Sequence, residues 1–224
     1  MTEAPTFRRA RSPEAKAERR RALIAAAAAL MDEGGAEAVT LGALAARAGM
    51  VKSAVYGYFA SREEILLRLM LVELEDLAAE LEAALAPLAG AERYAETARR
   101  IAAGFAARPR LCTLAGLLAT VLERQFDGPA LLEIKTELLA VATRFAVAGR
   151  AACPSVGTEG WALASRLAFS LVAGHWAFTN PAPHVAEILA RPDFAPIRKD
   201  FEADLAAGLA ALLRGLAAPP PDPK

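Results

Sequence analysis

The sequence of residues 40–59, TLGALAARAGMVKSAVYGYF, carries the pattern of two short helices joined by a tight turn. The spacing of its apolar residues predicts helices at about 41–48 and 52–59, and Gly49 between them supplies a turn that needs a positive φ. Helices this short are unstable alone, so they must share a core with neighbouring helices. This arrangement predicts a helix-turn-helix, a motif that presents its second helix to the major groove of DNA. We expect six side chains to form its core: Leu41, Leu44, Ala45, Ala48, Val55 and Phe59.

Longer helices are predicted on both sides of this motif. Ser12-Pro13 is typical of a helix start and Gly34-Gly35 of a helix end, so a helix is expected at about 13–33. The sequence SREE at 61–64 is a capping box, in which the serine accepts from the third amide of the helix and the last glutamate reaches back. It predicts a helix that continues to about residue 85.

The rest of the chain also predicts helices. Alanine and leucine dominate, β-branched residues are sparse, and proline or glycine repeatedly interrupts the pattern. Further helices are expected at about 91–107, 110–124, 129–152, 159–178, 184–191 and 197–215. The predicted fold class is therefore all-α.

The composition excludes several classes of protein. The chain of 224 residues is 55% hydrophobic and 23% charged, which is enough apolar material for a globular core. No apolar stretch is long enough to span a bilayer, and the polar, basic amino terminus lacks the apolar segment of an export signal. Cys112 and Cys153 are isolated, which predicts neither a disulfide framework nor a CxxC metal site. We expect a cytoplasmic protein with no membrane partner.

The net charge is zero, from 26 Lys and Arg against 26 Asp and Glu, but the charges are unevenly distributed. Residues 1–62 contain ten basic and six acidic residues, whereas residues 63–224 contain sixteen basic and twenty acidic ones. A basic amino-terminal part on an acidic body predicts an anionic partner at that end only.

Enzyme motifs are missing from the sequence. It contains no GxSxG, no HExxH and no glycine-rich phosphate loop, and neither cysteine has a nearby base in the sequence. We therefore expect no enzymatic activity, no cofactor and no metal site.

The pattern resembles the TetR (tetracycline-repressor-like) family of bacterial transcriptional regulators. The resemblance covers about residues 15–70 and rests on Thr40-Leu41, Leu44-Ala45, Ala48-Gly49, Val55-Tyr56, Tyr58-Phe59 and SREEIL at 61–66. It implies an all-helical homodimer whose amino-terminal domain binds double-stranded operator DNA and whose carboxy-terminal domain holds an inducer and the dimer interface. The expected parts are a disordered basic arm at 1–12, a helix-turn-helix DNA-binding domain at 13–60, a ligand-binding and dimerisation domain at 61–216, and a disordered tail at 217–224.

The resemblance also implies which residues contact DNA: Thr40, Lys52, Ser53, Ala54, Tyr56, Tyr58 and Arg62. Three positions depart from the family's pattern. Val51 stands where a serine or threonine is common, and Gly42 and Gly57 have no side chain to reach a base. Phosphate contacts and DNA shape are then expected to contribute more than direct base readout. For Tyr58, packing in the core is an equally good interpretation.

Two interpretations are open for the basic residues near the amino terminus, which are Arg8, Arg9, Arg11, Lys16, Arg19, Arg20 and Arg21. They either follow the phosphates and the minor groove of DNA, or form a flexible tail and a solvated helix face. Their position beside the helix-turn-helix favours DNA contact.

Five residues of the larger domain are candidate ligand contacts: Phe105, Leu118, Phe145, His175 and Trp176. Ligand sites in helical domains are apolar cavities with a few polar groups, although any single aromatic residue belongs more often to the core. His175 is the candidate polar anchor, and its alternative is a hydrogen-bonded core or interface histidine. These helices show no basic cluster for a phosphate or dicarboxylate, so a small, neutral, apolar or aromatic inducer is expected.

The sequence thus predicts a homodimeric repressor that leaves its operator when the inducer binds, with helices near 159–178 and 197–215 forming the dimer interface. The alternative is a helical ligand-binding or protein-interaction module with a basic docking surface and no sequence-specific DNA binding. The offsets between Gly49, Tyr56 and the Ser61 cap favour the regulator, because a basic patch alone does not require them.

Overall fold

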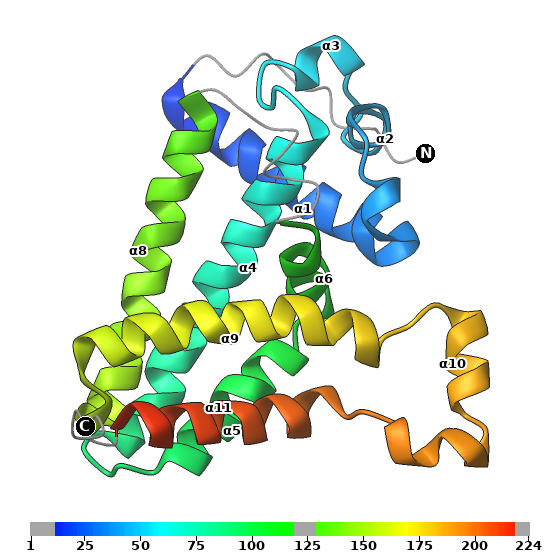
Figure 1. The fold of residues 1–224 in the computed structure, drawn as a ribbon. Helices are drawn as coiled ribbons and strands as arrows, with labels where there is room; N and C mark the ends of the chain where they lie inside the picture. Colours follow the sequence, from blue (N-terminus) through cyan, green and yellow to red (C-terminus); the bar gives the residue numbers. More distant parts are fainter. Residues whose placement is uncertain (1–11, 119–128, 218–224) are drawn as a thin grey trace. The chain divides into compact units, whose positions relative to one another are not determined.

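The computed structural model describes residues 12–118 and 129–217, and within these ranges it contains helices and turns but no strand (Figure 1). The prediction of an all-α fold is confirmed for these residues. The chain divides into two compact units, Met1–Leu69 and Met70–Lys224. None of the helices in the described ranges is long and apolar enough to cross a membrane.

The first unit holds the predicted helix-turn-helix. Its helices are α1 (Pro13–Ala38), α2 (Leu41–Arg47), α3 (Lys52–Val55) and the first turns of α4 (Arg62–Leu85). Ser12 Oγ accepts a hydrogen bond from the backbone N of Ala15 at 3.2 Å, so α1 begins at the predicted cap. Its helical geometry breaks at Gly34 and Gly35, as predicted, and a final turn follows to Ala38.

The division between the units falls within α4, after Leu69, whereas the sequence placed it after residue 60. The first turns of α4 are bonded to α1: Glu64 pairs with Arg20 at 2.7 Å, and Arg62 donates to a carbonyl at the end of α1 at 2.8 Å. Because of these bonds, the start of α4 belongs to the first unit.

The second unit is a set of packed helices. After α4 it contains η1 (Ala86–Leu88), α5 (Tyr94–Ala106), α6 (Pro109–Leu117), α8 (Pro129–Ala152), η3 (Pro154–Val156), α9 (Gly157–Thr179), α10 (Pro183–Leu189), η4 (Pro192–Ile197) and α11 (Phe201–Ala217). In this unit α11 packs along α5 and α9, and α9 also packs on α6 and α8. Figure 1 shows α9 and α11 side by side, and α10 beyond one end of that pair.

The predicted helices are present, with some changes at their ends. The second helix of the helix-turn-helix is much shorter than expected, because regular α3 ends at Val55 and i to i+3 turns follow. Gly57, a poor helix former, lies in these turns. The arm at 1–12, the end of the helix at 110–124 and the tail at 217–224 lie wholly or mostly outside the described residues.

Candidate functional site

Thr40 fixes the beginning of α2. Its Oγ1 accepts a hydrogen bond from the backbone N of Ala43 at 3.1 Å, which caps the helix. The residue is exposed, and the O–H of a hydroxyl that accepts one bond remains able to donate another. Thr40 can therefore cap α2 and donate to a phosphate at the same time.

A tight turn sets the direction in which α3 leaves α2. Gly49 has a φ of 62°, in the left-handed region that the sequence predicted, and the backbone N of Met50 donates to the Ala45 carbonyl at 2.9 Å. Of the six expected core residues, four are buried and two are half-buried. The buried ones are Leu44, Ala45, Val55 and Phe59, and the half-buried ones are Leu41 and Ala48.

Three of the seven expected DNA contacts are exposed on α3 and its C-cap. Lys52, Ser53 and Tyr56 are exposed, and we call these three residues the α3 surface. Their side chains form no hydrogen bond or ion pair with the part of the chain that the structure describes. Ala54 and Tyr58 are half-buried beside them. The α3 surface thus leaves one ammonium group and two hydroxyls available to an external partner.

The start of α3 lacks a side-chain cap. Val51 occupies the N-cap position, makes no capping bond and is 70% exposed. The helix α3 therefore begins without the capping bond that a serine or threonine at this position can supply.

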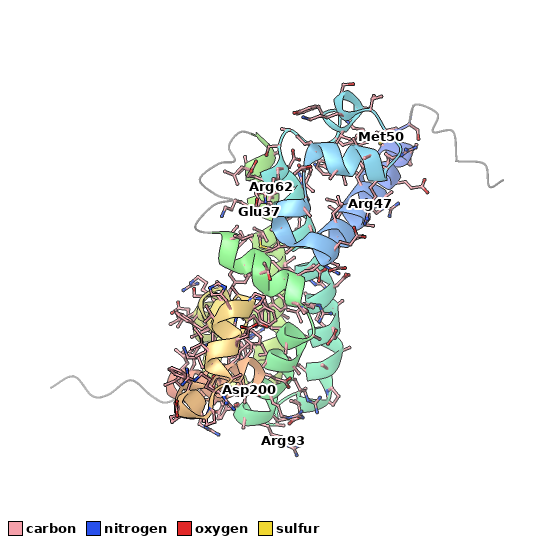
Figure 2. All side chains as sticks on the ribbon, turned by 90° about the vertical axis from the view of Figure 1, so that its right-hand side faces the viewer. Glu37, Arg47, Met50, Arg62, Arg93 and Asp200 are labelled. Atoms are coloured by element: carbon pink, nitrogen blue, oxygen red, sulfur yellow. The ribbon has the colours of Figure 1, made fainter. Side chains whose placement is uncertain are left out.

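Arg62 has an internal role that the sequence did not predict. Its guanidinium donates to the backbone carbonyls of Val39 at 2.9 Å and Ala36 at 2.8 Å, and it pairs with Glu37 at 3.2 Å. Figure 2 shows Arg62 and Glu37 next to one another. The Ala36 carbonyl also accepts from the backbone N of Val39 at 3.2 Å, so the group for which Arg62 supplies the partner is the Val39 carbonyl just after α1.

Glu64 is a buried carboxylate that fastens α4 to α1. Its backbone N donates to Ser61 Oγ at 3.2 Å, which confirms the first half of the predicted capping box. Its Oε2 accepts from the backbone N of Ala60 at 2.8 Å, and its Oε1 pairs with Arg20. The Arg20 guanidinium also lies 5.3 Å from the centre of the Phe59 ring, so this group helps to hold the residue that anchors the end of the helix-turn-helix.

The basic residues near the amino terminus have different surroundings. Arg20 is used internally, whereas Lys16 and Arg21 are exposed and Arg19 is half-buried. Arg8, Arg9 and Arg11 lie outside the described residues. Within α1, exposed positive charge is thus provided by Lys16 and Arg21.

The second unit contains a large, mostly apolar cavity. Its volume is about 730 Å³, and it is lined by α4, α5, α8, α9 and α11 together with Leu118. Such a volume is typical of sites for small molecules. Aromatic side chains form part of the wall: Phe105, Phe145, Trp161 and Phe169.

Three of the five candidate ligand residues line this cavity, namely Phe105, Leu118 and Phe145. The other two, His175 and Trp176, lie outside it. His175 Nε2 is 3.0 Å from Asp204 Oδ2, and Trp176 Nε1 donates to Thr113 Oγ1 at 3.1 Å. Both rings pack against Phe201 of α11. They therefore hold α9 to its neighbours, which is the packing alternative considered for both.

Trp161 is one of the cavity wall residues that were not among the five candidates from the sequence. It is buried, and its Nε1 donates to the Cys153 carbonyl at 3.0 Å. Its ring covers Gly149 of α8, where an added Cβ would lie 2.4 Å from the ring. The signal was present as a glycine in the last turn of a helix, but its partner on α9 is visible only in three dimensions.

The polar side chains of the lining are basic or neutral. They are Lys135, Thr143, Arg150, Thr158, Ser165 and Arg166. No basic cluster for a phosphate or dicarboxylate was expected on these helices, yet three cations line the cavity. The cations come from two separate helices, so no cluster is visible in the sequence.

Comparisons with known proteins agree with this architecture. A sequence model described as tetracyclin repressor-like, C-terminal domain, matches residues 71–220, and one described as bacterial regulatory proteins, tetR family, matches residues 23–69. No curated protein sequence matches the chain.

Two solved structures share the fold. One is a transcriptional regulator from Rhodococcus sp. Rha1, with 19% identity, a TM-score of 0.55 and coverage of 90% of this chain and 99% of that one. The other is a TetR from Streptomyces coelicolor, with 22% identity, a TM-score of 0.51 and coverage of 88% and 97%.

Proposed function

Because the chain belongs to the TetR family of bacterial transcriptional regulators, we propose that it is a homodimeric repressor that an inducer releases from its operator. It is a DNA-binding transcriptional regulator, and ligand binding and homodimer formation are typical of the family. We place its action in the cytoplasm, on chromosomal DNA, and assign it no catalytic activity.

The observation that supports DNA binding most directly is the α3 surface. Buried Val55 and Phe59 hold its inner side, while Lys52, Ser53 and Tyr56 face outward without internal partners. A short helix presented in this way fits the major groove, with Thr40 as a phosphate donor at the beginning of α2. Arg62 supports the end of α1 in this proposal and is not counted among the DNA contacts.

Release from DNA follows from differential binding. A ligand in the cavity shifts the dimer toward the conformation for which it has the higher affinity. If the two DNA-binding units are then no longer one helical turn apart, about 34–36 Å, they cannot occupy adjacent major grooves. The same coupling makes DNA weaken ligand binding by the same factor.

An exposed face on α9 and α11 supports the proposed dimer interface. Leu167 and Leu171 are 39% and 42% exposed, and a Cβ at Gly208 would lie 4.0 Å from Leu171 Cδ1. Among the described residues, no side chain and no backbone outside the local turns of α9 lies within 4 Å of a Cβ built at Gly174. Small residues beside exposed leucines allow two helix pairs to pack closely into a four-helix interface.

A gel shift with the DNA that flanks the protein's own gene tests this function. Tyr56→Ala should abolish the shift while the circular dichroism spectrum and melting temperature stay nearly unchanged, because Tyr56 is 52% exposed. Tyr56→Phe is the matched variant, since it removes only the hydroxyl and shows how much of the effect belongs to a hydrogen bond.

Two outcomes would contradict the proposal. A much lower melting temperature for Tyr56→Ala would make Tyr56 a structural residue. No shift with any flanking fragment would favour the alternative of a ligand-binding module with a basic docking surface.

A further inference from the structure

The charges that line the cavity are all of one sign. Lys135, Arg150 and Arg166 contribute to the wall, and none of the described lining residues is an aspartate or glutamate. This is opposite to the composition of the surrounding sequence, in which residues 63–224 contain sixteen basic and twenty acidic residues. A one-sided lining in an acidic part of the chain points to a ligand of negative charge.

Two of these cations lack an internal partner. Arg150 and Arg166 form no ion pair and their side chains donate no hydrogen bond to the described residues. Other arginines of the second unit are paired, for example Arg108 with Glu80 and Arg144 with Glu82. The two arginines at the cavity therefore have their donors available.

Arg150 and Arg166 flank the contact between Gly149 of α8 and Trp161 of α9. Arg150 follows Gly149, which is covered by the Trp161 ring, and Arg166 comes little more than one turn after Trp161 on α9. Both arginines are exposed, so the cavity lining reaches solvent at these residues. Lys135 lies fifteen residues before Arg150 on α8, roughly 22 Å away at 1.5 Å per residue.

Between Lys135 and Arg150 the wall is mostly apolar, with Thr143 as the polar exception on α8. Along α8 it includes Leu138, Val141, Phe145 and Ala146, and α4 contributes further leucines such as Leu74 and Leu81. An elongated apolar chain can lie along this wall, with its acidic group at Arg150 and Arg166, where it stays partly hydrated. Guanidinium groups bind carboxylates by paired hydrogen bonds, so the two arginines suit such a head group.

We infer that the inducer is an amphipathic carboxylate, with a long apolar chain inside the cavity and its acid group bound by Arg150 and Arg166. This inference deepens the proposed function, because the carboxylate acts as an inducer only if the protein is a ligand-responsive repressor. The carboxylate replaces the neutral ligand that was expected from the sequence.

Direct binding to the full chain tests this inference, by calorimetry and by the fluorescence of the tryptophans, of which Trp161 lines the cavity. The probes are laurate, lauryl alcohol and laurylamine, used as monomers in solution, which share one chain and differ in head group. Laurate should bind about tenfold more tightly than lauryl alcohol, as expected for charge-assisted hydrogen bonds, and laurylamine should bind most weakly.

Paired variants identify the groups responsible. Arg150→Gln/Arg166→Gln should bind laurate and lauryl alcohol equally, with the affinity for the alcohol unchanged. Arg99→Gln/Arg191→Gln is the matched control. It removes two exposed arginines that do not line the cavity, so its net charge changes by the same amount as in the test variant. This control should keep the preference for laurate.

Three results would overturn the inference: no saturable binding of laurate, equal binding of laurate and lauryl alcohol by the unmodified protein, or a preference for laurate that survives in Arg150→Gln/Arg166→Gln. Operator release is measured separately. Arginine-dependent laurate binding without any operator binding would leave the ligand assignment standing and refute the proposed function. Release of the protein from its operator by lauryl alcohol and not by laurate would support the proposed function and refute the carboxylate as the inducer.

Discussion

Lys52 and Arg62 are both cations of the first unit, but their surroundings differ. Arg62 bonds two carbonyls at the end of α1, so Arg62→Ala removes both bonds, leaves the carbonyl of buried Val39 unpaired and should lower the free energy of unfolding by about 1–3 kcal/mol. Lys52 is exposed and has no internal partner, so Lys52→Ala should leave that energy unchanged. Urea unfolding of both variants measures the difference.

The same pair of variants gives opposite results on DNA. Lys52→Ala should reduce the slope of log affinity against log salt by about 0.9, the value for one lost phosphate contact. Arg62→Ala, compared at a temperature where it is fully folded, should keep the slope of the unmodified protein. A reduced slope for Arg62→Ala would return Arg62 to the list of DNA contacts.

The buried thiol of Cys112 makes the free energy of unfolding depend on pH in the alkaline range. Burial, with a smaller contribution from the charge of Glu73, raises the pKa of its thiol from 9.0 to about 12. Between these values the folded chain keeps the proton and the unfolded chain has lost it. Stability should therefore fall as pH rises through this window, by up to about 1.4 kcal/mol per pH unit for this one group.

Urea unfolding between pH 8 and 11 measures this slope. Cys112→Ala should be less stable at pH 8, because it leaves a small cavity, and should lose stability less steeply above pH 9. Parallel curves for the two proteins would show that the thiol does not contribute.

Residue identity alone did not separate cavity residues from core residues. Phe145 and Trp176 look alike in sequence, as aromatic residues of apolar helices, yet Phe145 lines the cavity and Trp176 bonds Thr113. Arg150 and Arg166 look like solvated helix residues, because their common cavity depends on how α8 meets α9. Local patterns carry no information about such contacts between distant segments.

The turn between α2 and α3 is an element that the sequence predicted well, since Gly49 has the required positive φ. Gly49→Ala should destabilise the first unit by about 1–2 kcal/mol, because an added Cβ is strained in this conformation. Apart from the two adjacent residues, no atom of the described chain lies within 4 Å of that Cβ, so the cost is conformational rather than steric.

Gly42→Ala is the matched control for this turn. Gly42 lies inside α2 with no positive φ, so alanine there should raise stability by about 0.5–1 kcal/mol. Chemical unfolding of the two variants should give shifts of opposite sign. A shift of the same sign in both would mean that the backbone of the turn is not the cause.

Elements with chemical stop and start signals were placed within a few residues. Ser12 and Thr40 cap their helices, and Pro129 begins α8 as expected. The end of α3 was placed too late, because apolar spacing continues to Phe59 while the backbone changes to turns after Val55. Side-chain periodicity reports which residues are buried, and it does not distinguish a helix from successive turns with a similar repeat.

For the whole molecule, the proposed dimer interface on α9 and α11 gives the final prediction. Leu171→Glu places a charge on the exposed face of α9, and Gly208→Arg places one on the neighbouring face of α11. Each should give monomers that keep their helical content but lose operator affinity, because a monomer occupies only one half-site. Val72→Glu on α4 is the matched control, since Val72 and Leu171 are both 42% exposed. Sedimentation at micromolar concentration should find a dimer for Val72→Glu and for the unmodified chain.

Leu209 is unsuitable for this test, because it is buried within the unit and a charge there would unfold it. If Leu171→Glu and Gly208→Arg remain dimers, or if Val72→Glu also dissociates, the interface lies on other helices.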